Sequence, residues 1–223
     1  MLAARLLLCL AFVMAMLTHV SSAAGGSPAT ELHAAAASGD AARVGALLAS
    51  GAAIDARDAQ GRTALLVAAH RNQVQAAKVL IEAGADVNAK DAIQDSPYLY
   101  AGARGHNEIL RLALAHGADL RSTNRYGGTA LIPAAERGHV ETVRMLIAAG
   151  VDVDHVNRLK WTALLEAIIL GNGGTAHTEI VRLLVQARAD VNLADGEGVT
   201  PLQHARQRGY VQIERLLAAA GAR

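Results

Sequence analysis

Apolar residues come in short groups along most of the chain, separated by polar segments that contain glycine. One kind of group is rich in alanine, as at Ala68-Ala69 and Ala134-Ala135, and the next carries an aliphatic stripe, as at 79–81 and 183–185. This alternation predicts pairs of short helices, in which small alanine side chains let neighbouring helices approach closely. No single pair buries its apolar face alone, so the pattern predicts a stack of pairs.

The helix pairs recur with a period of 33 residues. The string at 63–65 returns at 96–98, 129–131 and 162–164, and then after 38 residues at 200–202. "GADVN" at 84–88 returns as "GADLR", "GVDVD" and "RADVN", and "GHNEI" at 105–109 returns as "GHVET" and "AHTEI". Three blocks in one register are a specific signature of a repeat architecture.

Each unit also carries signals for its helix boundaries. We expect a threonine hydroxyl to cap the first helix, because it accepts a backbone N–H that the first turn leaves unpaired. We expect a left-handed glycine to end each helix, and an extended arm that turns over as a hairpin to follow the second one. The caps are Thr63, Thr129, Thr162 and Thr200, and the glycines are Gly105, Gly138 and Gly209 after first helices and Gly84, Gly117, Gly150 and Gly221 after second helices.

The period and the three blocks resemble the ankyrin repeat family, and the resemblance covers about 30–223. It implies an all-α repeat solenoid of stacked helix–turn–helix ankyrin repeats with short β-hairpin connections, in the form of an elongated, curved rod. The six repeats are 30–57, 58–90, 91–123, 124–156, 157–194 and 195–223.

Several repeats depart from this pattern. Gln94 replaces the usual hairpin glycine, Tyr98 replaces a core leucine, and Arg188 replaces the glycine that ends a second helix, at a cost of about 1 kcal/mol. Pro133 falls inside a first helix, where its missing N–H predicts a distorted first turn. The additional residues of repeat five lie within 171–177, between its two helices. "GNGGTAHT" lacks the lysine and the third glycine of nucleotide-binding loops, so we interpret it as a flexible elbow.

Residues 1–23 have the pattern of a secretory signal peptide, with Arg5, an apolar run over 6–17 and small residues at the end. Cleavage after Ala23 or Ala24 would leave 24–29 as a short linker. The apolar run is shorter than the roughly 20 residues of a spanning helix, and the alternative is an uncleaved membrane anchor. We expect a periplasmic or secreted protein that resembles exported bacterial ankyrin proteins.

Composition narrows the classes of function. The formal net charge of +1 argues against a general nucleic-acid binder, which would carry a basic stripe and a high pI. Signal cleavage would remove Cys9, the one cysteine, and with it any disulfide, thiol nucleophile or cysteine-ligated zinc site. We therefore expect no cofactor, no nucleic acid and no membrane contact after cleavage.

Histidines and one glutamate are the candidates for metal binding or catalysis. His106, His139 and His177 occupy one repeat position, and successive repeats lie too far apart for them to share an ion. The resemblance implies that this histidine is structural and hydrogen-bonds across repeats. Glu166 and His204 occupy equivalent positions of neighbouring repeats, where they could act as an acid–base pair or simply satisfy each other. We expect no metal and no enzymatic activity.

The resemblance implies that hairpin tips and first-helix ends contact a partner on the concave face. Tryptophan, tyrosine and arginine dominate binding hot spots, and these types recur at the implied positions. The other interpretation is that the arginines are solvated and that the tryptophan packs on a neighbouring hairpin. The expected partner-binding residues are Arg71, Arg104, Arg125, Tyr126, Arg137, Arg158, Leu159, Trp161, Ile169, Leu170 and Arg208.

The expected function is that of a monomeric, non-catalytic scaffold or accessory factor that binds another protein in the periplasm or outside the cell. Repeats four and five are expected to hold the specialised site, with the 171–177 elbow as a mobile rim. The alternative is a binder of a small anion, held by the arginine stripe of Arg71, Arg104, Arg137 and Arg208.

Overall fold

The computed structural model describes residues 26–223, and these residues form twelve α-helices and no strand. They are α1 (Pro28–Ser38), α2 (Ala41–Ala49), α3 (Ala64–His70), α4 (Val74–Glu82), α5 (Pro97–Arg104), α6 (Asn107–Ala115), α7 (Leu131–Glu136), α8 (Val140–Ala149), α9 (Ala163–Ile169), α10 (Thr175–Gln186), α11 (Pro201–Gln207) and α12 (Val211–Ala219). The predicted signal segment 1–23 lies outside the described part of the chain.

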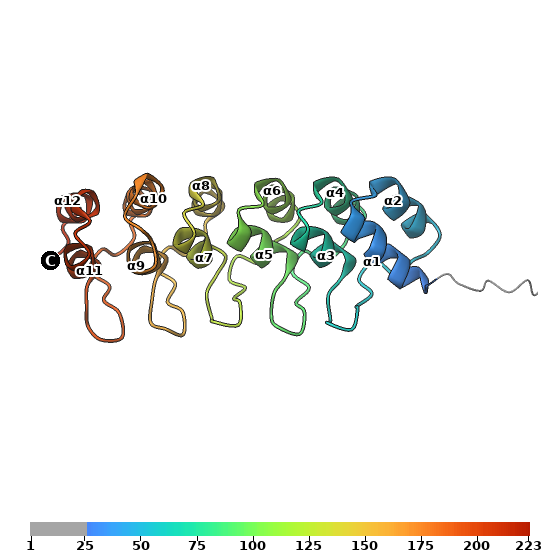
Figure 1. Ribbon diagram of the computed structural model, residues 1–223, viewed down its shortest axis with the longest axis horizontal. Coiled ribbons are helices and arrows are strands. Elements are labelled where there is room, and N and C mark those ends of the chain that lie inside the picture. Colours follow the sequence, from blue (N-terminus) through green and yellow to red (C-terminus); the bar gives the residue numbers. More distant parts are fainter. Residues whose placement is uncertain (1–25) are drawn as a thin grey trace, which may run out of the picture.

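The helices form two parallel rows (Figure 1). The odd-numbered helices pack against one another in one row, the even-numbered helices form the other, and hairpin loops project beyond the odd-numbered row (Figure 1). Ala68, Ala69, Ala134 and Ala135 have no exposed surface, so the alanine-rich helices do pack closely. The predicted all-α repeat solenoid is confirmed.

The connections are hairpin-shaped loops rather than the predicted β-hairpins, since none of 26–223 is in a strand. The loop of repeat four is closed by the Asn124 N–H, which donates to the Gly128 carbonyl at 2.9 Å. In repeat five the Asn157 N–H donates to the Trp161 carbonyl at 3.0 Å. Loops this short turn back before a strand ladder forms.

Threonine caps begin three of the first helices as predicted. The hydroxyl of Thr63 accepts from the Leu66 N–H, that of Thr162 accepts from the Leu165 N–H, and Thr200 forms a full capping box with Gln203. At the start of the chain Ser27 caps α1, which therefore begins at Pro28, within the segment expected to be a linker.

The prediction that Thr129 caps α7 is wrong. Its hydroxyl is buried and has no hydrogen-bond partner among residues 26–223. In repeat two the Val67 N–H donates to the Thr63 carbonyl, but the equivalent residue here is Pro133, which has no N–H. The Ile132 N–H bonds to the Thr129 carbonyl instead, at 3.3 Å, and α7 starts at Leu131. The predicted distortion of this first turn is therefore confirmed.

Left-handed residues end the helices where the sequence predicts them. Gly105 has a φ of 70°, and Gly150 has a φ of 90°. The non-glycine replacements adopt the same conformation, with a φ of 65° at Arg188 and 68° at Gln94. Lys160 does so as well, at 64°, which the sequence reading missed although it also stands at the hairpin glycine position.

The elbow between α9 and α10 is packed, not loose. The Tyr210 hydroxyl donates to the Gly171 carbonyl at 2.9 Å, and the Asn172 side chain accepts from the Gly174 N–H at 3.0 Å. The Asn172 oxygen also lies 3.0 Å from Nδ1 of His177. Part of the insertion continues as helix, because α10 begins at Thr175. These contacts contradict the expected flexible elbow and mobile rim.

No helix within 26–223 has the length and apolar character needed to cross a membrane.

Candidate functional site

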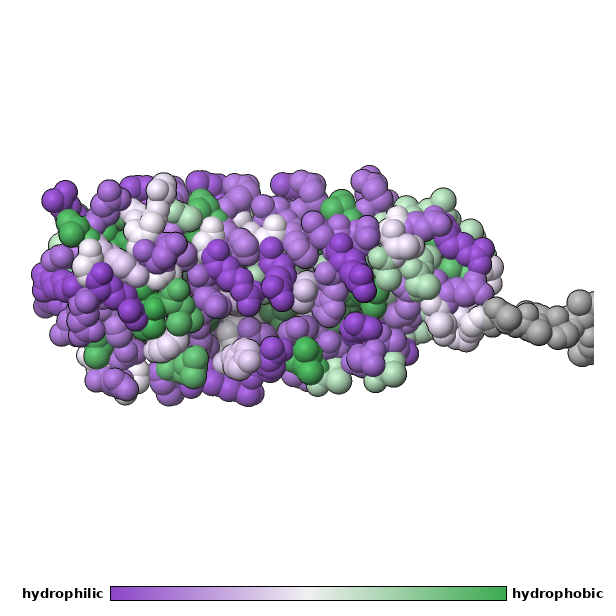
Figure 2. All heavy atoms as spheres, in the orientation of Figure 1, coloured by the Kyte–Doolittle hydropathy of each residue, from purple (hydrophilic) through white to green (hydrophobic). Residues whose placement is uncertain are grey.

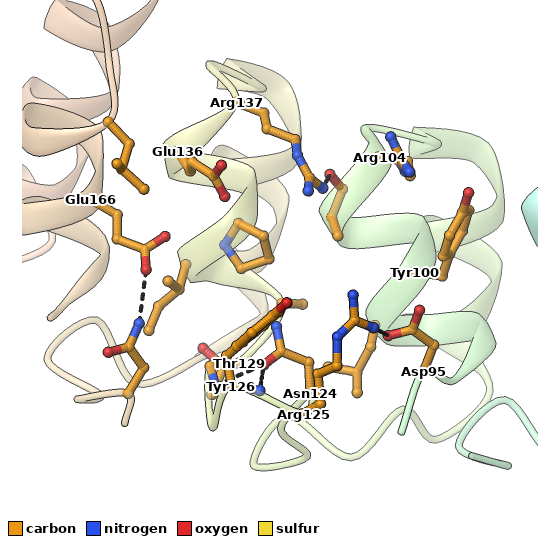
Figure 3. A pocket seen from close by; sticks show the side chains of 18 of the residues that line it. Asp95, Tyr100, Arg104, Asn124, Arg125, Tyr126, Thr129, Glu136, Arg137 and Glu166 are labelled. Atoms are coloured by element: carbon orange, nitrogen blue, oxygen red, sulfur yellow. Dashed lines mark hydrogen bonds and ion pairs between the residues drawn. The ribbon is translucent and has the colours of Figure 1, made fainter. Parts of the chain in front are cut away.

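A groove of about 410 Å³ lies between the first helices of repeats three, four and five and their hairpins. Helices α5, α7 and α9 supply one wall, and the hairpins of repeats four and five supply the other (Figure 3). The residues that shape it are Asp95, Tyr100, Arg104, Asn124, Arg125, Tyr126, Thr129, Ile132, Pro133, Glu136, Arg137, Asn157, Leu159, Glu166 and Leu170.

In the hairpins of repeats four and five, an asparagine at the base positions the exposed side chains at the tip. Oδ1 of Asn124 accepts from the N–H groups of Tyr126 and Gly128, at 2.9 and 3.1 Å. Oδ1 of Asn157 accepts from the N–H of Leu159 in the same way, at 2.9 Å. These short-range bonds fix the turn before any partner arrives, so Tyr126 and Leu159 are held at the rim of the groove.

The basic side of the groove consists of arginines that already have partners. The Arg125 guanidinium lies 3.8 Å from the Asp95 carboxylate and 4.9 Å from the centre of the Tyr126 ring. Arg104 stands over Tyr100 at 5.4 Å. Burial raises the pKa of Asp95, although Arg125 acts in the opposite direction.

Arg137 is also engaged, and it leans towards repeat three (Figure 3). Its Nη1 donates to the Ala103 carbonyl at 2.6 Å. The arginine therefore bridges two repeats across the top of the groove.

The acidic side of the groove lies between α7 and α9, where Glu136 and Glu166 point into it (Figure 3). Glu166 is only 6% exposed, and its Oε1 accepts from Nδ2 of Asn157 at 2.7 Å. Burial raises the pKa of Glu166 to about 7, and the nearby charge of Glu136 adds to the rise. A glutamate with this pKa changes its charge near neutral pH.

The expected contact between Glu166 and His204 does not form. Each residue pairs with the hairpin of its own repeat instead: Glu166 with Asn157, and His204 with Asp195, whose Oδ2 lies 2.7 Å from Nε2 of the histidine. Hydrogen bonds from the Val199 N–H and from His204 lower the pKa of Asp195 against the effect of burial. Both polar groups are satisfied locally, which removes the proposed acid–base dyad.

The comparisons with known proteins agree with this architecture. The sequence model described as "Ankyrin repeats (3 copies)" matches residues 1–91, 93–157 and 149–223. The chain belongs to the ankyrin repeat family.

Solved ankyrin structures superimpose over most of the chain. An ankyrin repeat domain from Acinetobacter baumannii AYE is 67% identical, with a TM-score of 0.85, over 86% of this chain and 98% of that one. The ankyrin repeat protein EF0377 is 43% identical, with a TM-score of 0.82, over 85% of this chain and 97% of its own. The ankyrin domain of Bcl-3, a member of the IkappaB family, is 28% identical, with a TM-score of 0.78, over 90% of this chain and 89% of that one.

Among curated proteins, the ankyrin repeat protein YahD of Escherichia coli K12 is 49% identical over 57 residues. This match spans 26% of the chain and 28% of YahD. Ankyrin repeats are in general protein–protein interaction modules and are typically non-catalytic.

The ankyrin histidine position has the structural role that the resemblance implied, in two of its three occurrences. Nδ1 of His106 lies 3.0 Å from the Ala69 carbonyl, and Nε2 of His177 lies 2.9 Å from the Glu136 carbonyl, in both cases in the preceding repeat. His139 packs on Gly105 and makes no such bond within the part of the chain that the structure describes. Within 26–223 no three His, Cys, Asp or Glu side chains are grouped as metal ligands would be.

The structure divides the predicted partner-binding residues into two sets. One set lines the groove: Arg104, Arg125, Tyr126, Arg137, Leu159 and Leu170. The other lies outside it: Arg71, Arg158, Trp161, Ile169 and Arg208. Trp161 and Ile169 are half-buried, and Arg158 donates to the Arg125 carbonyl at 2.8 Å. The arginine stripe thus does not converge on one point, and a small-anion site formed by all of it stays a prediction.

The sequence analysis did not place several residues in the groove: Tyr100, Asn124, Thr129, Pro133, Asn157 and Glu166. It considered Glu166 only as a partner of His204. A signal for some of them was present. Tyr100, Pro133 and Glu166 stand at one repeat position, four residues after the cap position, and so face one side of the solenoid.

Proposed function

We propose that this ankyrin repeat chain is a non-catalytic scaffold or accessory factor that binds another protein through the groove of repeats three to five. One observation carries the proposal: large exposed apolar side chains gather at this groove. Tyr126 is 56% exposed, Leu159 is 55% exposed and Leu170 is 50% exposed. Elsewhere, the face shown in Figure 2 is mostly hydrophilic, with small separate hydrophobic patches.

The surroundings of these side chains suit a protein partner. Arginine and tyrosine side chains next to an apolar patch are the residue types that contribute most at interfaces. The hairpins that carry Tyr126 and Leu159 are locked by Asn124 and Asn157, so little order has to be gained on binding. Glu166 and His204 are held by separate hairpin residues, which supports binding rather than acid–base catalysis.

Partner capture with matched variants tests this function. Tyr126→Ala combined with Leu159→Ala removes two exposed apolar groups of the groove and should abolish capture of the partner that the wild-type protein retains. Val211→Ala removes an apolar side chain that is 52% exposed on α12, outside the groove, and should leave capture unchanged. Equal capture by all three proteins would exclude the groove as the binding surface.

We propose in addition that the chain is exported and acts as a monomer in the periplasm or outside the cell. The support is the signal-peptide pattern of residues 1–23. Fractionation followed by N-terminal sequencing tests export, with a start at Ala24 or Gly25 expected. A start at Met1 in the membrane fraction would favour the uncleaved anchor. Light scattering on the purified protein measures its molar mass and so tests whether it is a monomer.

A further inference from the structure

The acidic side of the groove lacks a cationic partner. Within residues 26–223 neither Glu136 nor Glu166 forms an ion pair. Arg137, the cation whose charge acts on Glu166, is directed to the Ala103 carbonyl. Glu166 keeps one hydrogen bond, from the neutral amide of Asn157. Two neighbouring carboxylates, one of them almost fully buried, are unfavourable while both are ionised, and either a proton or a bound cation relieves them.

An independent feature of the same groove also points to a ligand. Thr129 lines the groove, is 2% exposed, and has a hydroxyl with no hydrogen-bond partner within the described chain. Because α7 begins at Leu131, this hydroxyl caps no N–H of the helix, and a buried hydroxyl without a partner costs about 1–3 kcal/mol. A polar group that entered the groove and reached this oxygen would satisfy it.

The walls next to the carboxylates are apolar. Leu170 follows Glu166 by about one turn at the end of α9, and Leu159 lies in the hairpin whose Asn157 bonds to Glu166. Ile132 and Pro133 of α7 also line the groove. Lysine and arginine combine an aliphatic stem with a charged end, and they bury the stem along apolar surface. A groove of about 410 Å³ has room for such a side chain.

We propose that the Glu136 and Glu166 carboxylates receive one lysine or arginine side chain of the protein partner, with its stem against Leu159 and Leu170. This inference rests on the proposed function and specifies the chemistry that the partner presents. The basic side of the groove does not compete for this role, because Arg125 is paired with Asp95 and Arg104 is stacked on Tyr100.

The protonation of Glu166 gives this site a defined pH dependence. Its pKa is raised to about 7 by burial and by Glu136, while Asn157 and Arg137 act in the opposite direction. Two more helices pack on α9: on α11, His204 is bonded to Asp195, and on α10, the ring of His177 is bonded to Asn172 and to the Glu136 carbonyl. A bound cation favours the ionised carboxylate. Affinity for a basic side chain is therefore full at pH 8 and falls by about tenfold at pH 6, where Glu166 is protonated in the free protein.

Random-sequence peptide display on the immobilised full chain tests the proposal. Peptides retained by the wild-type protein should share one lysine or arginine, and its replacement by glutamine should weaken binding by roughly tenfold or more. Glu136→Gln combined with Glu166→Gln should remove the preference for a basic residue and the loss of affinity at pH 6. Glu108→Gln combined with Glu141→Gln, on α6 and α8, is the matched control and should keep both.

Three results would overturn the basic-side-chain site: retained peptides without a shared basic residue, a preference that survives Glu136→Gln with Glu166→Gln, or no retained peptide. If partner capture still depends on Tyr126 and Leu159 in those cases, the proposed function stands and only this inference fails. If no groove variant affects capture, both fail.

Discussion

Glu166 shows most clearly how a single residue can depart from its repeat. Its equivalents are Val67, Tyr100, Pro133 and His204, so the position accepts almost any chemistry. The repeat pattern therefore predicts that this side chain lies on the first helix but not what it contacts. Its bond to Asn157 spans 9 residues, and His204 bonds to Asp195 over the same separation. Reading hairpin and helix as a linked pair would have placed both glutamate and histidine correctly.

At the residue scale, we predict that Glu166→Gln stabilises the protein in alkaline solution. The pKa of Glu166 is raised from 4.5 to about 7, so the folded state binds the proton more tightly than the unfolded state. The stability linked to that proton is full below about pH 4.5 and is lost as the pH rises through 7. Glutamine can still accept the hydrogen bond from Asn157.

The free energy of unfolding of Glu166→Gln should exceed that of the wild type by up to about 3 kcal/mol at pH 8, and the difference should vanish near pH 4. Urea denaturation at both pH values measures it. Glu197→Gln, at an exposed hairpin position, serves as the control and should change little at either pH. A variant that is equally or less stable than wild type at pH 8 would contradict the burial argument.

Among the elements, α7 is the one whose start the sequence reading misplaced. Pro133 predicted the distorted first turn, but the sequence analysis did not infer that the same proline removes the Thr129 cap. The missing N–H of Pro133 moves the helix start one residue along, from 130 to Leu131, and leaves the hydroxyl of Thr129, four residues earlier, without a partner in the described chain. A proline at the first helical position, as at Pro97 and Pro201, leaves the cap intact, whereas Pro133, three residues further in, removes an N–H that the first turn needs.

Substitution by the isosteric valine should have different effects on stability at a threonine that caps a helix and at one that does not. Thr162→Val removes a working cap and should destabilise the protein by about 1 kcal/mol. Thr129→Val removes a buried hydroxyl with no partner and should be neutral or stabilising. Urea unfolding midpoints provide the comparison, and equal losses for the two variants would show that Thr129 does cap α7.

The elbow before α10 gives a second test at the level of elements. A β-carbon on Gly171 would lie 2.1 Å from the Ala167 carbonyl oxygen and 2.5 Å from the His177 ring. Because backbone cannot yield cheaply, Gly171→Ala should lower the stability by about 1–3 kcal/mol.

The matched change is Gly45→Ala within α2, where the added β-carbon would lie 4.0 Å from Val79 of α4. This variant should raise the stability by about 0.5–1 kcal/mol. Thermal and urea midpoints decide between these directions. If Gly171→Ala left the stability unchanged, the flexible elbow suggested by the glycine content would be the better interpretation.

For the whole molecule, the sequence predicted the architecture because its period, caps and apolar stripes are local signals repeated several times. It also placed the hairpins and the first helices on one side of the solenoid, as the structure has them (Figure 1). It could not predict which arginines converge. Arg71 and Arg104 are identical in repeat position, yet only Arg104 faces the groove, whose shape depends on Tyr100 and on Pro133 one repeat further along.

The central claim is that repeats three to five bind a protein partner in one polarised groove. A crystal structure of the full chain with its captured partner tests this claim most directly. The partner should cover Tyr126, Leu159 and Leu170 and place a lysine or arginine between Glu136 and Glu166. A partner seated on the even-numbered helices, with the groove open to solvent, would contradict the account.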